Sequence, residues 1–296
     1  MEDGVDMAEL SADPVEAALA RCRLADVEIA YAEAGPTDGA LVILLHGFPE
    51  FWRAWRAQIA GLAEAGFRVV LPDQRGYGAS GKPQGIASYD LDRLADDIAA
   101  LARHLGHDRF TVIGHDWGAS VAWWLATRQP ELLDRLVVVN APHPAVWREA
   151  MGRDWRQWLK SLYVRFLQLP ALPEALVRAR GFKALADALA PACLPVDELA
   201  CYRAAWSAPG AVTGMINWYR AFLAKRLPPA ASLSITVPTL ILWGDRDPYA
   251  VPELAEASAA LCRDARIVHF PEATHWVHHE QPDRVGALIR AFLLGS

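Results

Sequence analysis

The sequence lacks the features that mark secreted, metal-binding or membrane-spanning proteins. It has four cysteines among 296 residues, with no Cys-x-x-Cys pair and no paired histidines at metal-ligand spacing. No apolar run reaches the ~18 residues that a membrane-spanning helix needs. The N-terminus also lacks the basic and apolar segments of a signal peptide. These absences predict reduced structural cysteines, no bound metal, no membrane span and a cytoplasmic location.

Concentrated positive charge is also missing. The chain has 29 Lys and Arg residues against 35 acidic ones, a formal net charge of −6, and its basic residues are scattered along the sequence. Binding to a phosphate backbone or a polybasic membrane anchor calls for a basic cluster. The composition therefore argues against nucleic acid as a partner and favours a small neutral substrate; it leaves the oligomeric state open. Residues 1–16 are acidic and aperiodic, which predicts a flexible tail.

What is present is an abundance of apolar residues, 53% of the chain, which is enough for a large core. Short runs rich in Val, Ile and Leu are bounded by turn residues and predict buried strands at 41–45, 67–71, 110–113, 136–139, 239–243 and 266–270. Helical patterns, of which 88–106 is the clearest, lie between several of them. Strands that alternate with helices predict an α/β fold with a mostly parallel sheet flanked by helices.

The alternation stops between residues 144 and 228. This stretch is helical in pattern, rich in aromatic residues and interrupted by prolines, and the strand pattern resumes after it. We therefore expect one core, formed by residues 17–143 and 229–296, with a helical lid inserted at 144–228. Ligands collect at the carboxyl ends of strands in open α/β sheets, so a lid there would enclose an apolar pocket.

The strand at 110–113 leads into the sequence Gly114-His115-Asp116-Trp117-Gly118 and then into a helical pattern. Glycines two residues before and two after Asp116 permit a tight strand-to-helix turn that exposes the central side chain, as in a nucleophile elbow. Asp116 could instead cap the helix, but the two glycines favour the elbow. No Gly-x-Ser-x-Gly occurs, so the usual serine nucleophile is absent.

The loop that follows the strand at 41–45 reads His46-Gly47-Phe48-Pro49. It could be a plain turn, or it could direct backbone N–H groups at a developing negative charge. Together with the elbow, it makes the N–H groups of Phe48 and Trp117 candidate oxyanion donors. We also expect His46, Pro49 and Trp117 to contact the substrate.

An acid and a histidine follow in the chain order of a catalytic relay. The strand at 239–243 ends before Asp245 and Asp247, of which either could be the acid and the other a turn residue. The strand at 266–270 is followed by His275, whereas His278 and His279 fall in a helical pattern. Placement in a loop favours His275 as the base.

Taken together, these motifs resemble the epoxide hydrolases of the α/β-hydrolase fold. The motifs are HGFPE (46–50), DQRGYGAS (73–80), GHDWGA (114–119), VNAPHP (139–144), NWYR (217–220), LWGDRD (242–247) and ATHW (273–276). The likeness extends from about residue 25 to the end of the chain, lid included. It implies that Asp116 is the nucleophile, Asp247 the acid and His275 the base. It also implies that Tyr163 and Tyr219 of the lid donate to the epoxide oxygen, that Tyr202 only packs, and that no cofactor is needed.

The resemblance implies hydrolysis of a small apolar epoxide to a vicinal diol through a covalent ester on Asp116. Haloalkane dehalogenases share the aspartate nucleophile, but they commonly place Asn or a similar donor where this chain has Phe48. Haloacetate dehalogenases carry arginines at the positions of Trp117 and Ser120, so a carboxylate substrate is disfavoured. A non-catalytic ligand-binding relative is a further alternative, because a fold alone does not establish activity.

Overall fold

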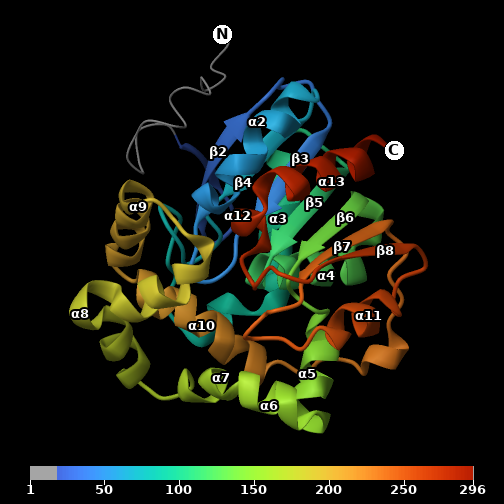
Figure 1. Ribbon diagram of the computed structural model, residues 1–296. Helices are drawn as coiled ribbons and strands as arrows, with labels where there is room; N and C mark the ends of the chain where they lie inside the picture. Colours follow the sequence, from blue (N-terminus) through green and yellow to red (C-terminus); the bar gives the residue numbers. More distant parts are fainter. Residues whose placement is uncertain (1–18, 296) are drawn as a thin grey trace.

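A computed structural model describes residues 19–295, so the tail predicted at residues 1–16 lies outside the described part of the chain. The core is an eight-stranded sheet with the order β1-β2-β4-β3-β5-β6-β7-β8 (Figure 1). Its strands are β1 (Ala20–Arg23), β2 (Glu28–Ala34), β3 (Leu41–Leu45), β4 (Arg68–Pro72), β5 (Phe110–His115), β6 (Leu133–Val139), β7 (Thr239–Gly244) and β8 (Ala265–Phe270). From β4 to β8 all neighbouring strands are parallel, which confirms the predicted α/β class.

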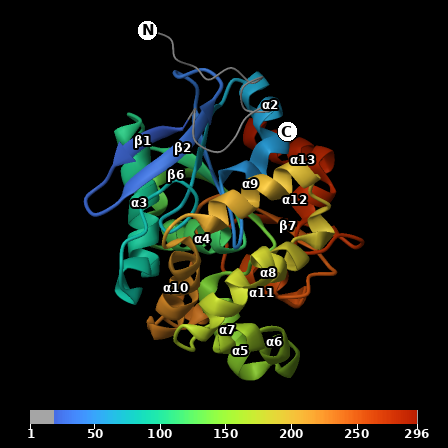
Figure 2. The same cartoon turned by 90° about the vertical axis from the view of Figure 1, so that its left-hand side faces the viewer.

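The helices fall into a core set and an inserted set. The core helices are α2 (Arg56–Glu64), α3 (Leu91–His104), α4 (Trp117–Arg128), α11 (Glu253–Ala259), α12 (Val277–Glu280) and α13 (Pro282–Leu294). Five short 3-10 helices are Trp52–Trp55, Ile86–Tyr89, Pro130–Leu132, Ala190–Ala192 and Ala230–Ser232. Helix α2 packs against α13, whereas α3 packs against α4 on the opposite face of the sheet (Figure 2).

The two antiparallel strands β1 and β2 were not predicted, and their composition explains why. Strand β1 is mostly exposed, and β2 is built largely of alanine and glutamate, so neither shows the Val, Ile and Leu run of a strand buried on both faces.

Helix α3 begins later than its pattern suggested. The Asp90 carboxylate accepts a hydrogen bond from the N–H of Asp92, which sets the start of the helix at Leu91.

Between β6 and β7 the chain forms the inserted helices, which lie beyond the carboxyl ends of the parallel strands (Figures 1 and 2). They are α5 (Pro144–Arg153), α6 (Trp155–Lys160), α7 (Leu162–Phe166), α8 (Leu172–Ala188), α9 (Val196–Ser207) and α10 (Ala211–Ala224). Within residues 19–295, no helix combines the length and the apolar character that crossing a membrane requires.

Many polar contacts fasten the inserted helices to the core, and several of them are charged. The indole N–H of Trp206 donates to the Pro49 carbonyl at 2.6 Å, and that of Trp218 donates to the Arg75 carbonyl at 2.9 Å. Arg53 of the core forms a buried ion pair with Glu198 at 2.8 Å. Because both donors and acceptors are withdrawn from water, each contact fixes the position of the lid over the sheet.

Candidate active site

Asp116 occupies a strained turn between β5 and α4. Its backbone lies at φ 49° and ψ −118°, a region that residues other than glycine rarely adopt. A Cβ atom on Gly118 would lie 2.3 Å from the Leu45 carbonyl oxygen, and one on Gly114 would lie 2.5 Å from the backbone of Gly118. Both positions therefore require glycine, because neighbouring backbone atoms lie too close for a side chain. Asp116 makes no side-chain cap to α4, so the helix-cap alternative is wrong.

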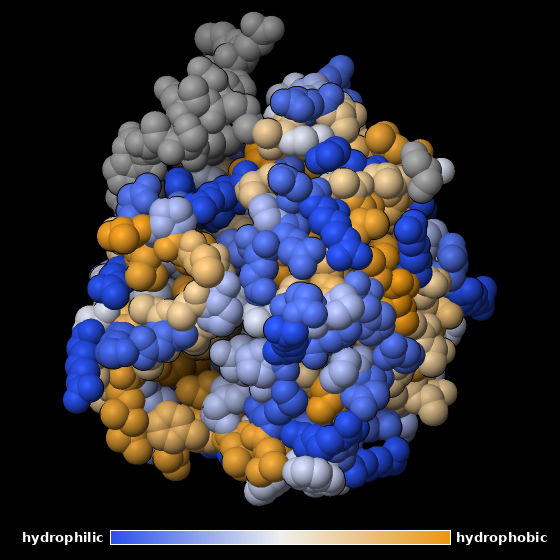
Figure 3. Space-filling model, in the orientation of Figure 1, coloured by the Kyte–Doolittle hydropathy of each residue, from blue (hydrophilic) through white to orange (hydrophobic). Residues whose placement is uncertain are grey.

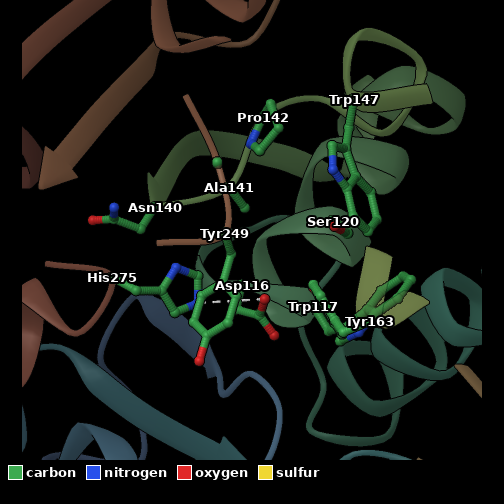
Figure 4. Close-up of a pocket in the computed structure, with 11 residues that line it drawn as sticks. Asp116, Trp117, Ser120, Asn140, Ala141, Pro142, Trp147, Tyr163, Tyr249 and His275 are labelled. Atoms are coloured by element: carbon green, nitrogen blue, oxygen red, sulfur yellow. Dashed lines mark ion pairs between the residues drawn. The ribbon is translucent and has the colours of Figure 1, made fainter. Parts of the chain in front are cut away.

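The loop after β3 directs a backbone donor at this carboxylate. The N–H of Phe48 donates to Oδ1 of Asp116 at 2.8 Å. Gly47 must stay without a side chain here, because its Cβ would lie 2.5 Å from the Cβ of Asp116. Trp117, the first residue of α4, lines the smaller of two cavities at Asp116, together with Asn140 and Trp147 (Figure 4). One oxygen of the nucleophile candidate is thus held while the other remains available.

That second oxygen faces the histidine of the loop after β8. Nε2 of His275 lies 3.4 Å from Oδ2 of Asp116 (Figure 4). Nδ1 of the same ring lies 2.7 Å from Oδ2 of Asp247. A carboxylate only accepts, so Nδ1 carries a proton that it donates to Asp247. Oδ1 of Asp245 instead lies 2.6 Å from Nδ1 of His269, away from the cavity. The structure therefore places Asp247, and not Asp245, beside the histidine.

Asp247 is itself held by several donors. Its Oδ1 accepts from the N–H groups of Tyr249 and Ala250, and its Oδ2 accepts from Nδ2 of Asn140 at 2.9 Å. Burial raises the pKa of Asp247, but the charge and hydrogen bond of His275 outweigh it and hold this pKa below its usual value. Asp247 therefore stays ionised and fixes the orientation of the imidazole.

Two carboxylates control the protonation of His275. Burial lowers the pKa of this histidine, yet the negative charges of Asp247 and Asp116 outweigh burial and raise its pKa to about 10. The imidazole is thus protonated at neutral pH as long as both carboxylates are charged. Any chemistry that neutralises Asp116 will lower this pKa.

A cavity of about 210 Å³ opens in front of Asp116, and the lid supplies one of its walls. Tyr163 of α7 and Tyr219 of α10 line it, with ring centroids 5.8 Å apart. Burial is the main cause that raises the pKa of both phenols well above the ordinary value. The negative charge of Asp116 adds to the effect. Both hydroxyls therefore keep their protons at neutral pH and can donate hydrogen bonds to an oxygen in the cavity. Most of the remaining wall is apolar: Phe48, Pro49, Leu167, Val177, Leu185 and Trp276.

Two other residues considered from the sequence lie away from the cavity. His46 is fully buried, its Nε2 accepts from the N–H of Gln74 at 3.0 Å, and it lines neither cavity at Asp116. Its position suits it to hold the loop and not to contact a substrate, because its polar atoms are engaged by backbone. Tyr202 is buried among aromatic rings and also lines neither cavity.

Sequence reasoning missed Tyr249 and Asn140. Tyr249 lines both cavities next to Asp116, and its ring centroid lies 5.0 Å from that of His275. Its position two residues after Asp247 was the only available signal. Asn140 lies in the VNAPHP motif, and its contacts with Asp247 and the backbone of Gly244 depend on the pairing of β6 with β7.

A second buried group lies directly behind the site. Nδ1 of His115 faces a carboxylate oxygen of Glu50 at 2.7 Å, and its Nε2 faces the His275 carbonyl at 3.0 Å. The pKa of Glu50 is held well below its usual value by the neighbouring histidines despite its burial, so Glu50 is a buried carboxylate whose partners include His115. Glu50 also accepts from the N–H of Gly47. These contacts connect the elbow, the loop after β3 and the loop of the base.

His278 and His279 belong to that rear group and not to the cavity. Nε2 of His279 lies 2.8 Å from Glu50, and His278 stacks near His115. The ligand atoms of Glu50, His278 and His279 lie within 4.8 Å of one another, the one such grouping in residues 19–295 that could hold a metal ion. Because Glu50 is already hydrogen-bonded on both oxygens, its burial is explained without a metal.

Comparisons with known proteins identify the family of this chain. A family model for the alpha/beta hydrolase fold matches residues 40–282. The AB hydrolase superfamily protein YfhM of Bacillus subtilis is 43% identical over 88% of this chain and 93% of its own length. Human epoxide hydrolase 4 is 38% identical over 89% of this chain and 75% of its own length.

Solved structures give the same assignment. One described among novel epoxide hydrolases from metagenomes of hot environments is 36% identical, with a TM-score of 0.85 over 94% of this chain and 99% of its own. An epoxide hydrolase of Bacillus megaterium in complex with an inhibitor is 29% identical, also with a TM-score of 0.85, over 93% of this chain and 99% of its own. This chain therefore belongs to the α/β-hydrolase fold family, among its epoxide hydrolases.

Proposed function

We propose that this hydrolase converts a small apolar epoxide into a vicinal diol through a covalent ester on Asp116. The observation that carries the proposal is the arrangement around one cavity. The free oxygen of Asp116 faces Nε2 of His275, and the phenols of Tyr163 and Tyr219 line the same space. A nucleophile, a base and two acids for a departing oxygen thus surround a mostly apolar volume.

In the first half-reaction, Oδ2 of Asp116 attacks a ring carbon while the bond between that carbon and the epoxide oxygen breaks. The phenols of Tyr163 and Tyr219 stabilise the departing oxygen, and one of them transfers its proton to it. The ester forms with Oδ1 of Asp116 still bonded to the N–H of Phe48. This step leaves a phenolate in the cavity and removes the negative charge of Asp116.

Loss of that charge prepares the second half-reaction. With Asp116 esterified, one of the two carboxylates that keep His275 protonated is gone, so its pKa falls. The proton of His275 then returns to the phenolate through the cavity, and the imidazole becomes a base only when an ester is present. Asp247 keeps its orientation throughout.

Neutral His275 next removes a proton from a water molecule, whose oxygen adds to the ester carbonyl of Asp116. The N–H of Phe48 stabilises the oxyanion, a contribution on the order of 3 kcal/mol per donor. The ester bond breaks, and the diol oxygen takes the proton of the new carboxylic acid. Asp116 is left as carboxylate, His275 protonated and both phenols neutral, as at the start, with one water consumed.

The test is a single turnover of a styrene oxide type substrate. His275→Gln should accumulate the ester, seen as an intact-mass increase equal to the substrate, whereas Asp116→Asn should show no adduct. In the wild type, turnover in water enriched in ¹⁸O should place the label in Asp116 before it reaches any diol. Label in the first diol, with no adduct on His275→Gln, would overturn the proposal.

Haloalkane dehalogenation remains the competing use of the same nucleophile. The Phe48 side chain offers no hydrogen-bond donor to a halide, and a halide leaving group requires no proton from Tyr163 or Tyr219. A haloalkane assayed beside the epoxide separates the two reactions. Halide release without diol formation would assign the site to dehalogenation, and neither product would favour a non-catalytic relative.

A further inference from the structure

The lid exposes an unusual concentration of large apolar side chains. Eleven such side chains are exposed in residues 19–295, and eight of them lie between residues 155 and 176, on α6, α7 and the start of α8. Trp155 is 71% exposed, and Phe166, Leu172 and Leu176 are also exposed. We call this surface the lid face. Figure 3 shows apolar side chains gathered where α7 and α8 lie in Figure 1, beside a hollow in the surface. A patch of this kind marks an interaction site.

The charge of the same segment is opposite to that of the chain. Residues 155–188 contain six Lys and Arg residues and two acidic ones, a formal charge of +4, whereas the whole chain carries −6. Arg156 and Lys183 are paired with acidic side chains, and Lys160 donates to the Asp247 carbonyl. Among residues 19–295, Arg165, Arg178 and Arg180 take part in none of the ion pairs. These three arginines lie on α7 and α8, two of the helices that carry the exposed apolar side chains.

A groove beside the lid face offers a place for an anionic group. Its volume is about 350 Å³, and it is lined by Arg148 and Arg165 together with Trp158, Val164 and Leu223. The guanidinium of Arg165 lies over the Trp158 ring. Nε of Arg148 is buried without a hydrogen-bond partner. The other two nitrogens of Arg148 donate to the carbonyls of Lys225 and Phe222. Arg165 is exposed and is therefore the guanidinium of the groove that an anionic oxygen can reach, and guanidinium groups suit phosphate geometry.

We propose that the lid face binds the surface of membranes that contain anionic phospholipids, with a lipid phosphate in the groove of Arg148 and Arg165. Exposed Trp, Phe and Leu interspersed with Lys and Arg are what the boundary between lipid headgroups and acyl chains accepts. A second copy of the chain fits less well, because a two-fold contact would bring two positive faces together. The partner must be negative and must accept apolar side chains.

This surface has a consequence for the apolar cavity. Leu167, Val177 and Leu185, which lie on α8 or directly after α7, line the cavity of Asp116. An apolar substrate dissolved in a membrane would therefore meet the lid before it meets water. Lipid binding is measured without turnover, so it can succeed or fail independently of the proposed reaction.

The test is co-sedimentation of the full chain with vesicles of phosphatidylcholine alone and of phosphatidylcholine mixed with phosphatidylglycerol. We expect binding to the anionic vesicles that weakens at high salt, and little binding to the neutral ones. A variant with Trp155→Ser, Leu172→Ser and Leu176→Ser should bind the anionic vesicles at least about tenfold more weakly than the wild type, because it loses side chains that insert into the interface. Arg165→Gln should weaken binding to anionic vesicles alone.

The matched control is Val196→Ser. Val196 is 89% exposed on α9, outside the lid face, so its loss should leave vesicle binding unchanged. Circular dichroism and diol formation without vesicles verify that each variant is folded. Equal binding of wild type and triple variant, or no binding to anionic vesicles, would overturn the proposal. A dimer in light scattering that the triple variant loses would assign the face to a second copy instead.

Discussion

Core and lid both contain non-glycine residues with positive φ, but the two sets differ in what surrounds them. In the core, the only two such residues within 19–295 are Asp116 and Asn140, and both belong to the candidate active site. In the lid they are Ala171, Arg180, Phe182 and Cys193, and none of these lines the cavity of Asp116. Strain in the core is retained where it positions reacting groups. In the lid it marks bends of the chain, including the interruption of α8.

The two regions are also held differently. The core site is fixed by charged hydrogen bonds from the sheet and its loops, such as those to Asp247 and Glu50. The lid contributes Tyr163 and Tyr219, and it is fastened to the core by other residues, such as Glu198 with Arg53 and Lys225 with Asp90 and Asp92. Because these contacts do not use the two phenols, we expect changes at the phenols to separate chemistry from stability, and changes at Asp247 or Glu50 to affect both.

The largest effect on stability should come from the buried Glu50 carboxylate behind the site. Glu50→Gln removes the buried carboxylate that His115, His279 and the N–H of Gly47 contact, and breaking a buried pair from one side costs about 3–5 kcal/mol. Chemical denaturation measures this as a fall in the free energy of unfolding. Glu272→Gln, at an exposed acid of the loop before His275, is the control and should change little. Equal stability of the two variants would mean that the charge of Glu50 does not stabilise the fold.

The next largest effect should separate lid from core. Tyr163→Phe and Tyr219→Phe each remove one donor to the leaving oxygen, which should slow ester formation about 10²-fold, while the melting temperature stays close to wild type. Stopped-flow kinetics measures ester formation apart from its hydrolysis. Tyr202→Phe is the matched control, since its hydroxyl has no hydrogen-bond partner. If both site variants turned over at the wild-type rate, other groups would have to protonate the oxygen.

The pH dependence of stability should report on His275. Its folded-state pKa of about 10 lies above the ordinary value of about 6.5, so the stabilisation from its ion pairs is complete below that ordinary value. It is lost as pH rises through 10, at no more than about 1.4 kcal/mol per pH unit. Denaturation across this range should show a decline that is absent in His275→Gln. Asp116→Asn should show an intermediate decline, and parallel profiles for all three proteins would contradict the coupling.

The smallest effect should come from strain in the lid. Ala171 is exposed and lies at φ 60° and ψ −33°, which glycine tolerates without a steric penalty. Ala171→Gly relieves strain of about 1–2 kcal/mol in the folded state. Glycine also makes the unfolded chain more flexible, which lowers the free energy of unfolding by about 0.4–1 kcal/mol. A net stabilisation of about 0.5 kcal/mol should appear in denaturant unfolding. Ala175→Gly, inside α8, is the control and should destabilise by about 1 kcal/mol.

Much of the core could be predicted because its signals are local. A strand buried on both faces requires a continuous apolar run, and an elbow requires small residues on both sides of its central residue, as at Gly114 and Gly118. The strands β1 and β2 carry no such run and were missed. His46 looked like a substrate contact because it adjoins Phe48 and Pro49, but the sheet directs its ring inward. The location in the cytoplasm stays a prediction.

The sequence by itself determined the fold class and indicated where inserted helices lie and which residue types follow the strands, because periodicity and glycine spacing act over a few residues. Tertiary structure alone decided that Asp247 and not Asp245 meets His275. It also brought Tyr249 and Asn140 to the candidate site, paired His115 with Glu50, and left the apolar side chains of the lid face exposed. These outcomes depend on which strand ends and helices become neighbours in space, and no pattern within one segment specifies such pairings.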